Sequence, residues 1–313
     1  MSELKPRKDL LDIEDLSREE LEYLLEAAKP FKDLITKSIK KVPPLKGKSV
    51  LTLFYEPSTR TRSSFEIAAK RLSADVTNFS VSSSSVVKGE SILDTVDTLQ
   101  SMRVDYIVVR HGHSGVPNLI ARHTGASVLN AGDGWHSHPT QALLDAFTLR
   151  EVHPESTGKR VLLIGDILHS RVARSVRLIL RKLEVEVGLL GPKTLMPSWV
   201  PEDSPVFDSW EDAMKWSPEV IYLLRVQKER QDEQFFPTLH EYHRIYGLTG
   251  ERLEQVRAEG IHIMHPGPVN RGVEVADAVM EYERSLINQQ VENGIAARMA
   301  VLYWLRPKGS RDE

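Results

Sequence analysis

The chain has 313 residues, of which 41% are hydrophobic and 27% charged, with a formal net charge of -3 and no cysteine. This length and composition predict a globular protein of two domains, and the missing cysteines exclude disulfides, thiolate metal ligands and a cysteine nucleophile. The small net charge gives no general attraction to nucleic acid or anionic membranes, and the lack of a signal core or of about 18 consecutive apolar residues leads us to expect a cytoplasmic protein.

The first half of the chain alternates helix patterns with strand patterns. Ser17 and Glu20 form a capping box, and the helix that they begin is expected to end near Ala28. The strand patterns that follow are short, apolar and rich in β-branched residues, as in strands buried on both faces of a parallel sheet. They are expected at residues 50–55, 76–79, 106–109 and 128–129, with helices at 63–72 and 91–101.

A second series of the same kind occupies the rest of the chain. Its strands are expected at residues 161–164, 185–190, 220–224 and 261–264, with a helix at 170–183. Strands that alternate with helices are typical of parallel sheets covered by helices. Two such series predict two doubly wound parallel-sheet domains of the α/β class.

A helical segment at residues 139–151 joins the two series, and we expect it to be the interdomain helix. The last helix pattern, at 288–305, has a long apolar face and is expected to pack back on the first domain. The expected domains are therefore residues 1–138 with 288–313 and residues 152–287.

One segment of the second domain departs from this alternation. Charged residues crowd positions 227–233, and the aromatic-rich sequence FFPTLHEYHRIY follows at 235–246. We expect this region to be a mobile loop beside a site rather than part of the core.

Residues 50–62 (VLTLFYEPSTRTR) are the most informative stretch of the sequence. An apolar strand pattern is followed by Ser58, Thr59, Arg60 and Thr61, where a helix pattern begins. Helix N-termini carry unpaired N–H groups and the positive end of the helix dipole, so they bind phosphate, and arginine adds charge-assisted hydrogen bonds. A capping hydroxyl with solvated arginines is the simpler alternative, and this segment alone leaves both open.

Candidate ligand residues recur at the expected carboxyl ends of strands in both halves of the chain. Open α/β sheets bind their ligands at these ends, and a repeated coincidence from both domains predicts an interdomain active site. The residues concerned are Ser58 to Thr61, Arg110, His138, Arg171, Arg225 and Pro266.

Six short motifs follow one another along nearly the whole chain. They are STRTR at 58–62, KGE at 88–90, Arg110-His111, HPTQ at 138–141, RVQ at 225–227 and HPGP at 265–268. Each is modest in specificity alone, but the set in this order resembles the transcarbamoylase family, and within it the catalytic chains of aspartate carbamoyltransferase. The resemblance implies transfer of the carbamoyl group from carbamoyl phosphate to L-aspartate, giving N-carbamoyl-L-aspartate and phosphate, an early step of pyrimidine biosynthesis.

The ornithine branch of the family is the nearest alternative. Its members typically carry an HCLP motif and an SMG motif, whereas this chain has HPGP, no cysteine and no Ser-Met-Gly. It has instead Arg225-Val226-Gln227, and an arginine fork suits the carboxylate of aspartate, whereas the ammonium of ornithine would need a carboxylate.

The resemblance implies a reaction without a cofactor, a metal ion or a covalent protein nucleophile. The aspartate amine attacks the carbamoyl carbon, a tetrahedral oxyanion forms and phosphate leaves; Arg60 is expected to be the main catalytic residue. The catalytic residues implied are Arg60, Thr61, Lys88, Arg110 and His138. The residues implied to bind carbamoyl phosphate are Ser58, Thr59, Arg60, Thr61, Ser84, Arg110, His138, Gln141, Pro266 and Gly267.

Four residues are implied to bind aspartate: Lys88, Arg171, Arg225 and Gln227. Arg171 is expected to hold the α-carboxylate, and Arg225 and Gln227 the side-chain carboxylate. The helix that Arg171 begins carries three further arginines at spacings of three to four residues, for which a solvated basic face is the simpler interpretation: Arg174, Arg177 and Arg181.

The serine-rich stretch SVSSSSVVKGE at 80–90 favours a flexible linker on composition alone. The resemblance instead implies that this loop enters the active site of a neighbouring subunit in a homotrimer, with Lys88 and either Ser84 or Ser85 as ligands. Association with regulatory chains or with dihydroorotase stays open, as does the group that accepts the amine proton.

Two other interpretations use different features of the sequence. The HxH pairs at 111–113 and 136–138 could belong to a metal-dependent amidohydrolase, but such enzymes need a carboxylate ligand and further histidines after later strands, where this chain offers only His265. An inactive relative that only binds anions is the second alternative. Each polar position that the family uses is present here, which favours an enzyme.

Overall fold

The computed structural model describes residues 4–37, 41–80, 91–198, 204–226 and 238–305. The chain divides into two compact units, Met1–Phe147 with Glu292–Glu313, and Thr148–Val291. The first division falls within helix α5 (Pro139–Val152), inside the expected interdomain helix at 139–151. The second falls within helix α10 (Ile287–Trp304), four residues beyond the boundary expected at residue 287. Within the described residues, no helix has both the length and the apolar character needed to cross a membrane.

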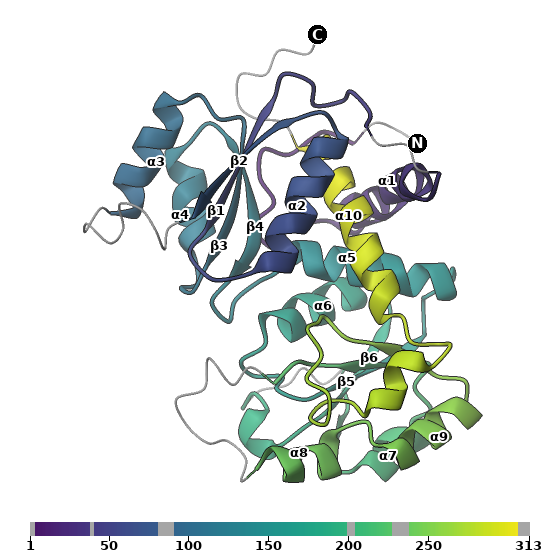
Figure 1. The fold of residues 1–313 in the computed structure, drawn as a ribbon. Helices are drawn as coiled ribbons and strands as arrows, with labels where there is room; N and C mark the ends of the chain where they lie inside the picture. The colour runs from purple at the N-terminus through teal and green to yellow at the C-terminus, as the bar shows by residue number, and fades with distance from the viewer. Residues whose placement is uncertain (1–3, 38–40, 81–90, 199–203, 227–237, 306–313) are drawn as a thin grey trace. The chain divides into compact units, whose positions relative to one another are not determined.

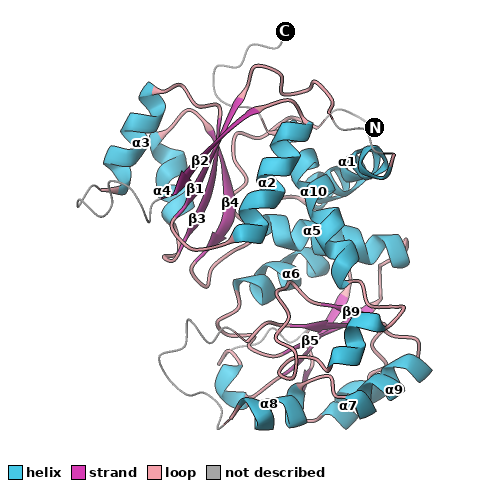
Figure 2. Cartoon of the chain, in the orientation of Figure 1, coloured by secondary structure: helices cyan, strands magenta, loops and turns pink. Residues whose placement is uncertain are grey.

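The first unit is built on a parallel sheet of four strands in the order β2-β1-β3-β4. Its strands are β1 (Ser49–Phe54), β2 (Asp75–Ser80), β3 (Tyr106–His111) and β4 (Ser127–Asp133). Its helices, besides parts of α5 and α10, are α1 (Arg18–Thr36), α2 (Thr59–Arg71), α3 (Ile92–Ser101) and α4 (Val116–His123). Figures 1 and 2 show the four strands fanned side by side with helices around them.

The second unit is built on a parallel sheet of five strands in the order β7-β6-β5-β8-β9. Its strands are β5 (Arg160–Ile164), β6 (Glu186–Leu190), β7 (Val206–Phe207), β8 (Val220–Leu223) and β9 (His262–Met264). Its helices are α6 (Arg171–Lys182), α7 (Trp210–Lys215), α8 (Leu239–Tyr246) and α9 (Gly250–Ala258), with short 3-10 turns at Lys193–Leu195 and Asp277–Glu281. The predicted pair of doubly wound α/β domains is confirmed.

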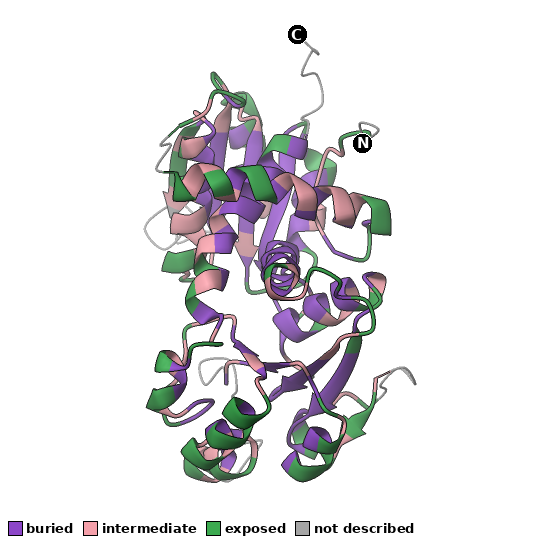
Figure 3. Cartoon of the chain, turned by 90° about the vertical axis from the view of Figure 1, so that its right-hand side faces the viewer, coloured by how far each residue is buried: buried purple, intermediate pink, exposed green. Residues whose placement is uncertain are grey.

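Both sheets are buried at their centres, as Figure 3 shows for most strand residues. Leu53, Ile107 and Val109 in the first sheet have no exposed surface, and the same holds for Leu162 and Ile221 in the second. Each such side chain stabilises its unit by about 1.5–3 kcal/mol. The continuous apolar runs of these strands thus reflect burial on both faces of each sheet.

The order of the strands creates one switch point in each sheet. The chain runs from β1 outward to β2 and then returns to β3 on the other side of β1. In the second sheet it runs from β5 to β6 and β7 and returns to β8 on the other side of β5. The loops that leave neighbouring strands in opposite directions open a crevice at the carboxyl ends, where such sheets bind ligands.

Two expectations about helices are wrong. Helix α1 runs to Thr36 rather than ending near Ala28, because Pro30 removes only one hydrogen bond while Phe31 continues the buried face. Residues 239–246, expected to be loop, form helix α8, which Thr238 caps by accepting a hydrogen bond from Glu241 N. Tyr242 of that helix is 2% exposed and packs in the core, and the remainder of the expected loop, 227–237, lies outside the described residues.

Candidate active site

The N-terminus of helix α2 differs from the N-termini of six other helices in the described part of the chain. Its N-cap residue, Ser58, makes no capping hydrogen bond, and the first turn contains no acidic residue. Elsewhere six helices begin with a hydroxyl that accepts the backbone N–H three residues on, namely those of Ser17, Ser91, Ser170, Ser209, Thr238 and Thr249. The first-turn N–H groups of α2 and the Ser58 hydroxyl can therefore both serve an anion.

The side chains predicted to bind phosphate surround this helix start. Ser58 and Thr61 are half-buried, whereas Thr59 and Arg60 are exposed. They follow β1 directly, at the switch point of the first sheet. Backbone N–H groups, hydroxyls and a guanidinium are thus gathered at one helix end, which is the chemistry of a phosphate site.

Arg110 lies on the neighbouring strand β3, at the level where β1 ends. Its backbone pairs with Phe54, and its carbonyl oxygen accepts a hydrogen bond from Tyr55 N at 2.9 Å. The guanidinium Nε lies 3.3 Å from Glu56 Oε2, and Nη1 donates to the Ala131 carbonyl at 3.2 Å. With 15% of its side chain exposed, Arg110 is a cation held in place between the carboxyl ends of β1 and β4.

His138 is presented by a braced loop between β4 and α5. The loop is held by the fully buried carboxylate of Asp133, and His136 bridges that carboxylate to Asp12, with its Nδ1 3.1 Å from Asp133 Oδ2 and its Nε2 3.1 Å from Asp12 Oδ2. Asp133 also accepts hydrogen bonds from Asn130 Nδ2 (2.8 Å), Ser137 N (3.1 Å) and Gly115 N (2.7 Å). His138 itself is 4% exposed, and its carbonyl begins helix α5 by accepting from Gln141 N.

Gln141 lies on the first turn of α5, three residues after His138. Its side chain is 9% exposed, and its Nε2 donates to Asp145 Oδ1 one turn further along the helix, at 3.0 Å. In the first unit, the fold therefore presents Arg110, His138 and Gln141 near the carboxyl ends of β3 and β4.

Arg171 is the first residue of α6, which follows β5 at the switch point of the second sheet. Its side chain is buried, with 2% exposed. Ser170 caps the helix by accepting from Ala173 N at 3.1 Å. Of the three other arginines of α6, Arg174 and Arg181 are exposed and Arg177 is half-buried, as a solvated face requires.

Arg225 follows strand β8, on the other side of the same switch point. The next residue, Val226, donates its N–H to Glu274 Oε1 at 2.7 Å. Glu274 is buried and also accepts from Asn270 N at 2.6 Å and from Asn270 Nδ2 at 2.7 Å, and its Oε2 lies 3.8 Å from His265 Nε2. One carboxylate thus ties the backbone beside Arg225 to the loop that follows β9.

The loop with Pro266 and Gly267 is fixed by His265. Gly267 N donates to His265 Nδ1 at 2.8 Å, and His265 N donates to Gln290 Oε1 at 2.9 Å. Burial raises the pKa of the Glu274 carboxyl, against the opposing effect of its hydrogen bonds from Val226 and Asn270. In the second unit, Arg171, Arg225 and the Pro266 loop all follow strands at their carboxyl ends.

Three predicted ligands, Ser84, Lys88 and Gln227, lie outside the described residues, as does the alternative Ser85. Three supporting carboxylates were not predicted from the sequence: Glu56, Asp133 and Glu274. Glu56 stands two residues before Ser58 and could have been proposed as a partner for a strand-end arginine. The other two give no local signal, because their partners come from distant segments.

The HxH pairs have structural partners. His111 Nδ1 accepts a hydrogen bond from His113 N at 2.8 Å, and burial, followed by the neighbouring His113, lowers the pKa of His111. His136 lies between two carboxylates in the brace described above. Among the residues that the structure describes, no group of three or more histidine, aspartate or glutamate side chains is arranged to hold a metal ion.

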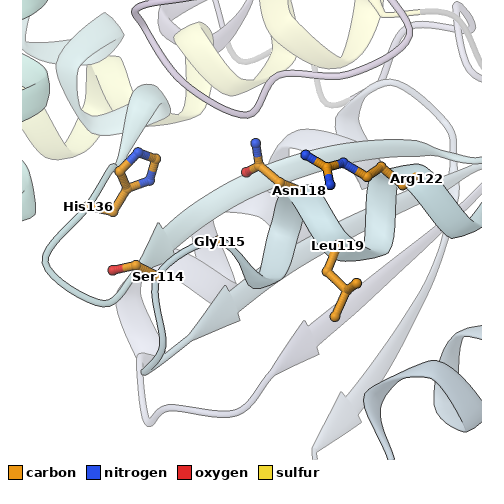
Figure 4. A pocket seen from close by; sticks show the side chains of 6 residues that line it. All are labelled: Ser114, Gly115, Asn118, Leu119, Arg122 and His136. Carbon is orange, nitrogen blue, oxygen red and sulfur yellow. The ribbon is translucent and has the colours of Figure 1, made fainter.

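Two hollows in the first unit lie away from these residues. One, of about 420 Å³, lies beside α4, where Asn118 and Arg122 project from the same side of the helix toward the His136 loop (Figure 4). The other, of about 570 Å³, is lined mainly by apolar residues of α1 and by Tyr303 of α10. Neither lining includes a residue of the candidate site, which is recognised by its chemistry at the strand ends.

Comparison with known proteins matches nearly the whole chain. Residues 8–151 match the family model described as aspartate/ornithine carbamoyltransferase, carbamoyl-P binding domain, and residues 157–305 match that of the Asp/Orn binding domain. The chain is 66% identical over 303 residues to the aspartate carbamoyltransferase catalytic subunit of Akkermansia muciniphila, covering 97% of this chain and 98% of that one. It is 52% identical to the subunit of the same name from Carboxydothermus hydrogenoformans, covering 96% of each chain.

Solved structures of similar fold include those of aspartate transcarbamoylases. Aspartate transcarbamoylase from Trypanosoma cruzi in complex with carbamoyl phosphate and aspartate has a TM-score of 0.86 and 29% identity, covering 97% of this chain and 98% of that one. The catalytic subunit of M. jannaschii aspartate transcarbamoylase has a TM-score of 0.82 and 33% identity, covering 95% and 97%.

Proposed function

This chain belongs to the aspartate/ornithine carbamoyltransferase family, and we propose that its first unit binds carbamoyl phosphate and its second binds L-aspartate. The enzyme transfers the carbamoyl group of carbamoyl phosphate to the α-amino group of L-aspartate. The products are N-carbamoyl-L-aspartate and phosphate, in an early step of pyrimidine biosynthesis.

The observation that carries the proposal is the free N-cap of α2 at the switch point of the first sheet. In six other helices of the described chain, the N-cap hydroxyl accepts a hydrogen bond from a backbone N–H of the same helix, whereas the Ser58 hydroxyl makes no such bond. Arg110 stands on the adjacent strand, held by Glu56 and the Ala131 carbonyl. This arrangement supports a site for a small dianionic acyl phosphate, with Arg60 beside it.

The proposed chemistry follows from these groups. The neutral aspartate amine forms a bond to the carbamoyl carbon, and the bond from that carbon to the phosphate oxygen breaks. The nitrogen gives up one proton, which the departing phosphate can accept. Thr61, Arg110 and His138 are proposed to stabilise the negative charge on the carbamoyl oxygen, and Arg60 the charge on the departing phosphate. Donors positioned in this way each contribute roughly 10²–10³ in rate.

Two arginines at the second switch point support an acceptor with two carboxylates. Arg171 is buried at the start of α6, and Arg225 follows β8. We assign Arg171 to the α-carboxylate and Arg225 to the side-chain carboxylate of aspartate, because arginine binds carboxylates through two parallel hydrogen bonds. The ammonium of ornithine would be repelled by Arg225.

The proposal also includes a cytoplasmic homotrimer with active sites shared between subunits. Its basis is the family resemblance of the KGE motif at 88–90. Ser84 and Lys88 would complete the site of a neighbouring subunit, and Gln227 would assist Arg225.

Phosphate release from carbamoyl phosphate tests the reaction, with L-aspartate or L-ornithine as acceptor. We expect turnover with aspartate only, unchanged by a chelator. Arg60→Ala should lower kcat by about 10²-fold or more, whereas Lys70→Ala, at an exposed position near the end of the same helix, should leave kcat near that of the wild type. Turnover with ornithine alone, or a normal kcat for Arg60→Ala, would refute the assignment.

Subunit mixing tests the shared site. Lys88→Ala and Arg60→Ala proteins should each be inactive, and a mixture allowed to exchange subunits should regain part of the activity, because some sites then combine two intact halves. Mass spectrometry should first show that the subunits have exchanged. If the activity then does not recover, each site lies within a single chain.

A further inference from the structure

A buried polar cluster joins three helices of the first unit. It consists of Gln141 and Asp145 on α5, Arg298 on α10 and Ser64 on α2. Asp145 is 2% exposed and Arg298 4%. Burying a carboxylate and a guanidinium is seldom better for stability than apolar packing, so the presence of both beside a proposed substrate ligand calls for a functional reason.

Arg298 is held tightly where the three helices meet. Its Nη1 donates to Ser64 Oγ at 3.1 Å and to the Gly294 carbonyl at 2.8 Å, and its guanidinium carbon lies 5.0 Å from the centre of the Phe65 ring. Gly294 allows this close approach, since a Cβ there would lie 3.3 Å from Leu144 Cδ2 and 2.6 Å from Arg298 Nη1.

Arg298 stays charged at neutral pH. Burial lowers its pKa to about 10, and the Asp145 carboxylate opposes that shift. At pH 7 the guanidinium is therefore protonated, and it is attracted to the Asp145 carboxylate. An ionised carboxylate offers only acceptors to its neighbours.

The neighbour of Asp145 is the Gln141 amide, one turn earlier on α5. Gln141 Nε2 donates to Asp145 Oδ1 at 3.0 Å. The reverse orientation would set the amide oxygen against a carboxylate oxygen, two acceptors without a proton between them. The amide oxygen of Gln141 is thus turned away from Asp145 and can accept a hydrogen bond from another group.

We infer that Asp145, attracted by the charge of Arg298, is a positioning residue that fixes the Gln141 amide with its oxygen toward the substrate and so selects an acyl phosphate carrying an NH₂ group. This inference rests on the proposed function, in which Gln141 binds the carbamoyl group. Carbamoyl phosphate offers an N–H donor to that oxygen. Acetyl phosphate has the same shape but presents a methyl group, which leaves the oxygen unsatisfied.

The test is the selectivity of Asp145→Asn for the two acyl phosphates. An asparagine can donate from Nδ2 to the Gln141 oxygen, so the Gln141 amide can rotate by about 180° without losing its hydrogen bond to residue 145. For wild type and variant, kcat/KM is measured for carbamoyl phosphate with L-aspartate, and Ki is measured for acetyl phosphate as a competitor. Multiplying kcat/KM by Ki gives the selectivity, which we expect to fall about tenfold or more in Asp145→Asn.

Two further variants separate positioning from folding. Asp105→Asn removes a structural carboxylate of the same unit, which accepts from Ser49 N at 2.8 Å, and should lower stability without changing the selectivity. Arg298→Lys keeps the positive charge but loses the planar guanidinium, and should lower the selectivity less than Asp145→Asn does. It also replaces Asp145→Asn as the test if that variant does not fold.

The possible outcomes separate this inference from the proposed function on which it rests. A wild-type enzyme without turnover of carbamoyl phosphate and aspartate would refute the proposed function itself. Normal wild-type turnover, with an unchanged selectivity in the folded Asp145→Asn and Arg298→Lys variants, would overturn only the inference and leave the cluster a structural one.

Discussion

Helices α1 and α2 of the first unit each follow a serine at the N-cap, and the same substitution at these two serines should have opposite consequences. Ser17 caps α1: its Oγ accepts from Glu20 N at 3.2 Å, and Glu20 Oε2 accepts from Ser17 N at 2.7 Å. Ser58 precedes α2 without a capping hydrogen bond. Replacing each serine by alanine therefore removes a structural contact in the first case and a proposed substrate contact in the second.

The expected magnitudes follow from these contacts. Loss of a hydroxyl N-cap costs about 1 kcal/mol of stability, so Ser17→Ala should lower the free energy of unfolding by about that amount and leave substrate binding unchanged. Ser58→Ala should change the free energy of unfolding by less than about 0.5 kcal/mol. A hydrogen bond to a charged phosphate contributes about 1.5–3 kcal/mol, so the KM for carbamoyl phosphate should rise roughly 10- to 100-fold.

The assay combines urea unfolding with steady-state kinetics for both variants. A binding measurement that does not depend on turnover supports them: inorganic phosphate should stabilise the wild type and Ser17→Ala against thermal unfolding, because a ligand of the folded state raises the midpoint, and should do so much less for Ser58→Ala. A Ser58→Ala protein that loses about 1 kcal/mol of stability and keeps a normal KM would show that Ser58 is an ordinary cap, and the phosphate site at α2 would have to be abandoned.

Three further predictions concern the second unit. Glu274→Gln should raise the KM for aspartate about tenfold or more with little change in that for carbamoyl phosphate, because the amide can no longer accept from both Val226 N and Asn270 N; an equal rise for both substrates would contradict this. Arg225→Ala should raise the KM for aspartate and abolish discrimination against an acceptor with an uncharged side chain, so retained discrimination would remove Arg225 from the site. Burial, with smaller effects of His153 and Arg284, lowers the pKa of His262 from 6.5 to about 4. The folded state thus favours the neutral ring, and stability present above pH 6.5 should be lost as the pH falls toward 4. The shift corresponds to about 3 kcal/mol, which we reduce to about 1–2 kcal/mol because the ring is only half-buried. In urea unfolding at pH 7 and pH 5, His262→Gln should show a weaker loss than the wild type, and an equal loss would assign the effect to other groups.

The fold class and much of the candidate site could be predicted from the amino-acid sequence alone. Strands buried on both faces need continuous apolar runs, and helices need local caps, so both signals lie within a few residues of the element that they specify. For the same reason local patterns place the STRTR motif at a helix start, and Arg110, Arg171 and Arg225 at strand ends. Helix α8 was not predicted, because its aromatic residues follow a charged segment and were interpreted as part of the same loop, although they form the buried face of a helix.

The neighbours of each strand end, and the carboxylates that hold the site, depend on the tertiary structure. The order β2-β1-β3-β4 brings Ser58 and Arg110 to one switch point, and no local pattern records the order of strands in a sheet. Glu274 reaches Val226 across 48 residues, and Arg298 reaches Ser64 across 234. Such contacts arise because packing brings distant segments together, and their partners carry no matching signal in the chain. For that reason the proposed ligands were visible in the sequence, while the groups that orient them became visible only in the folded chain.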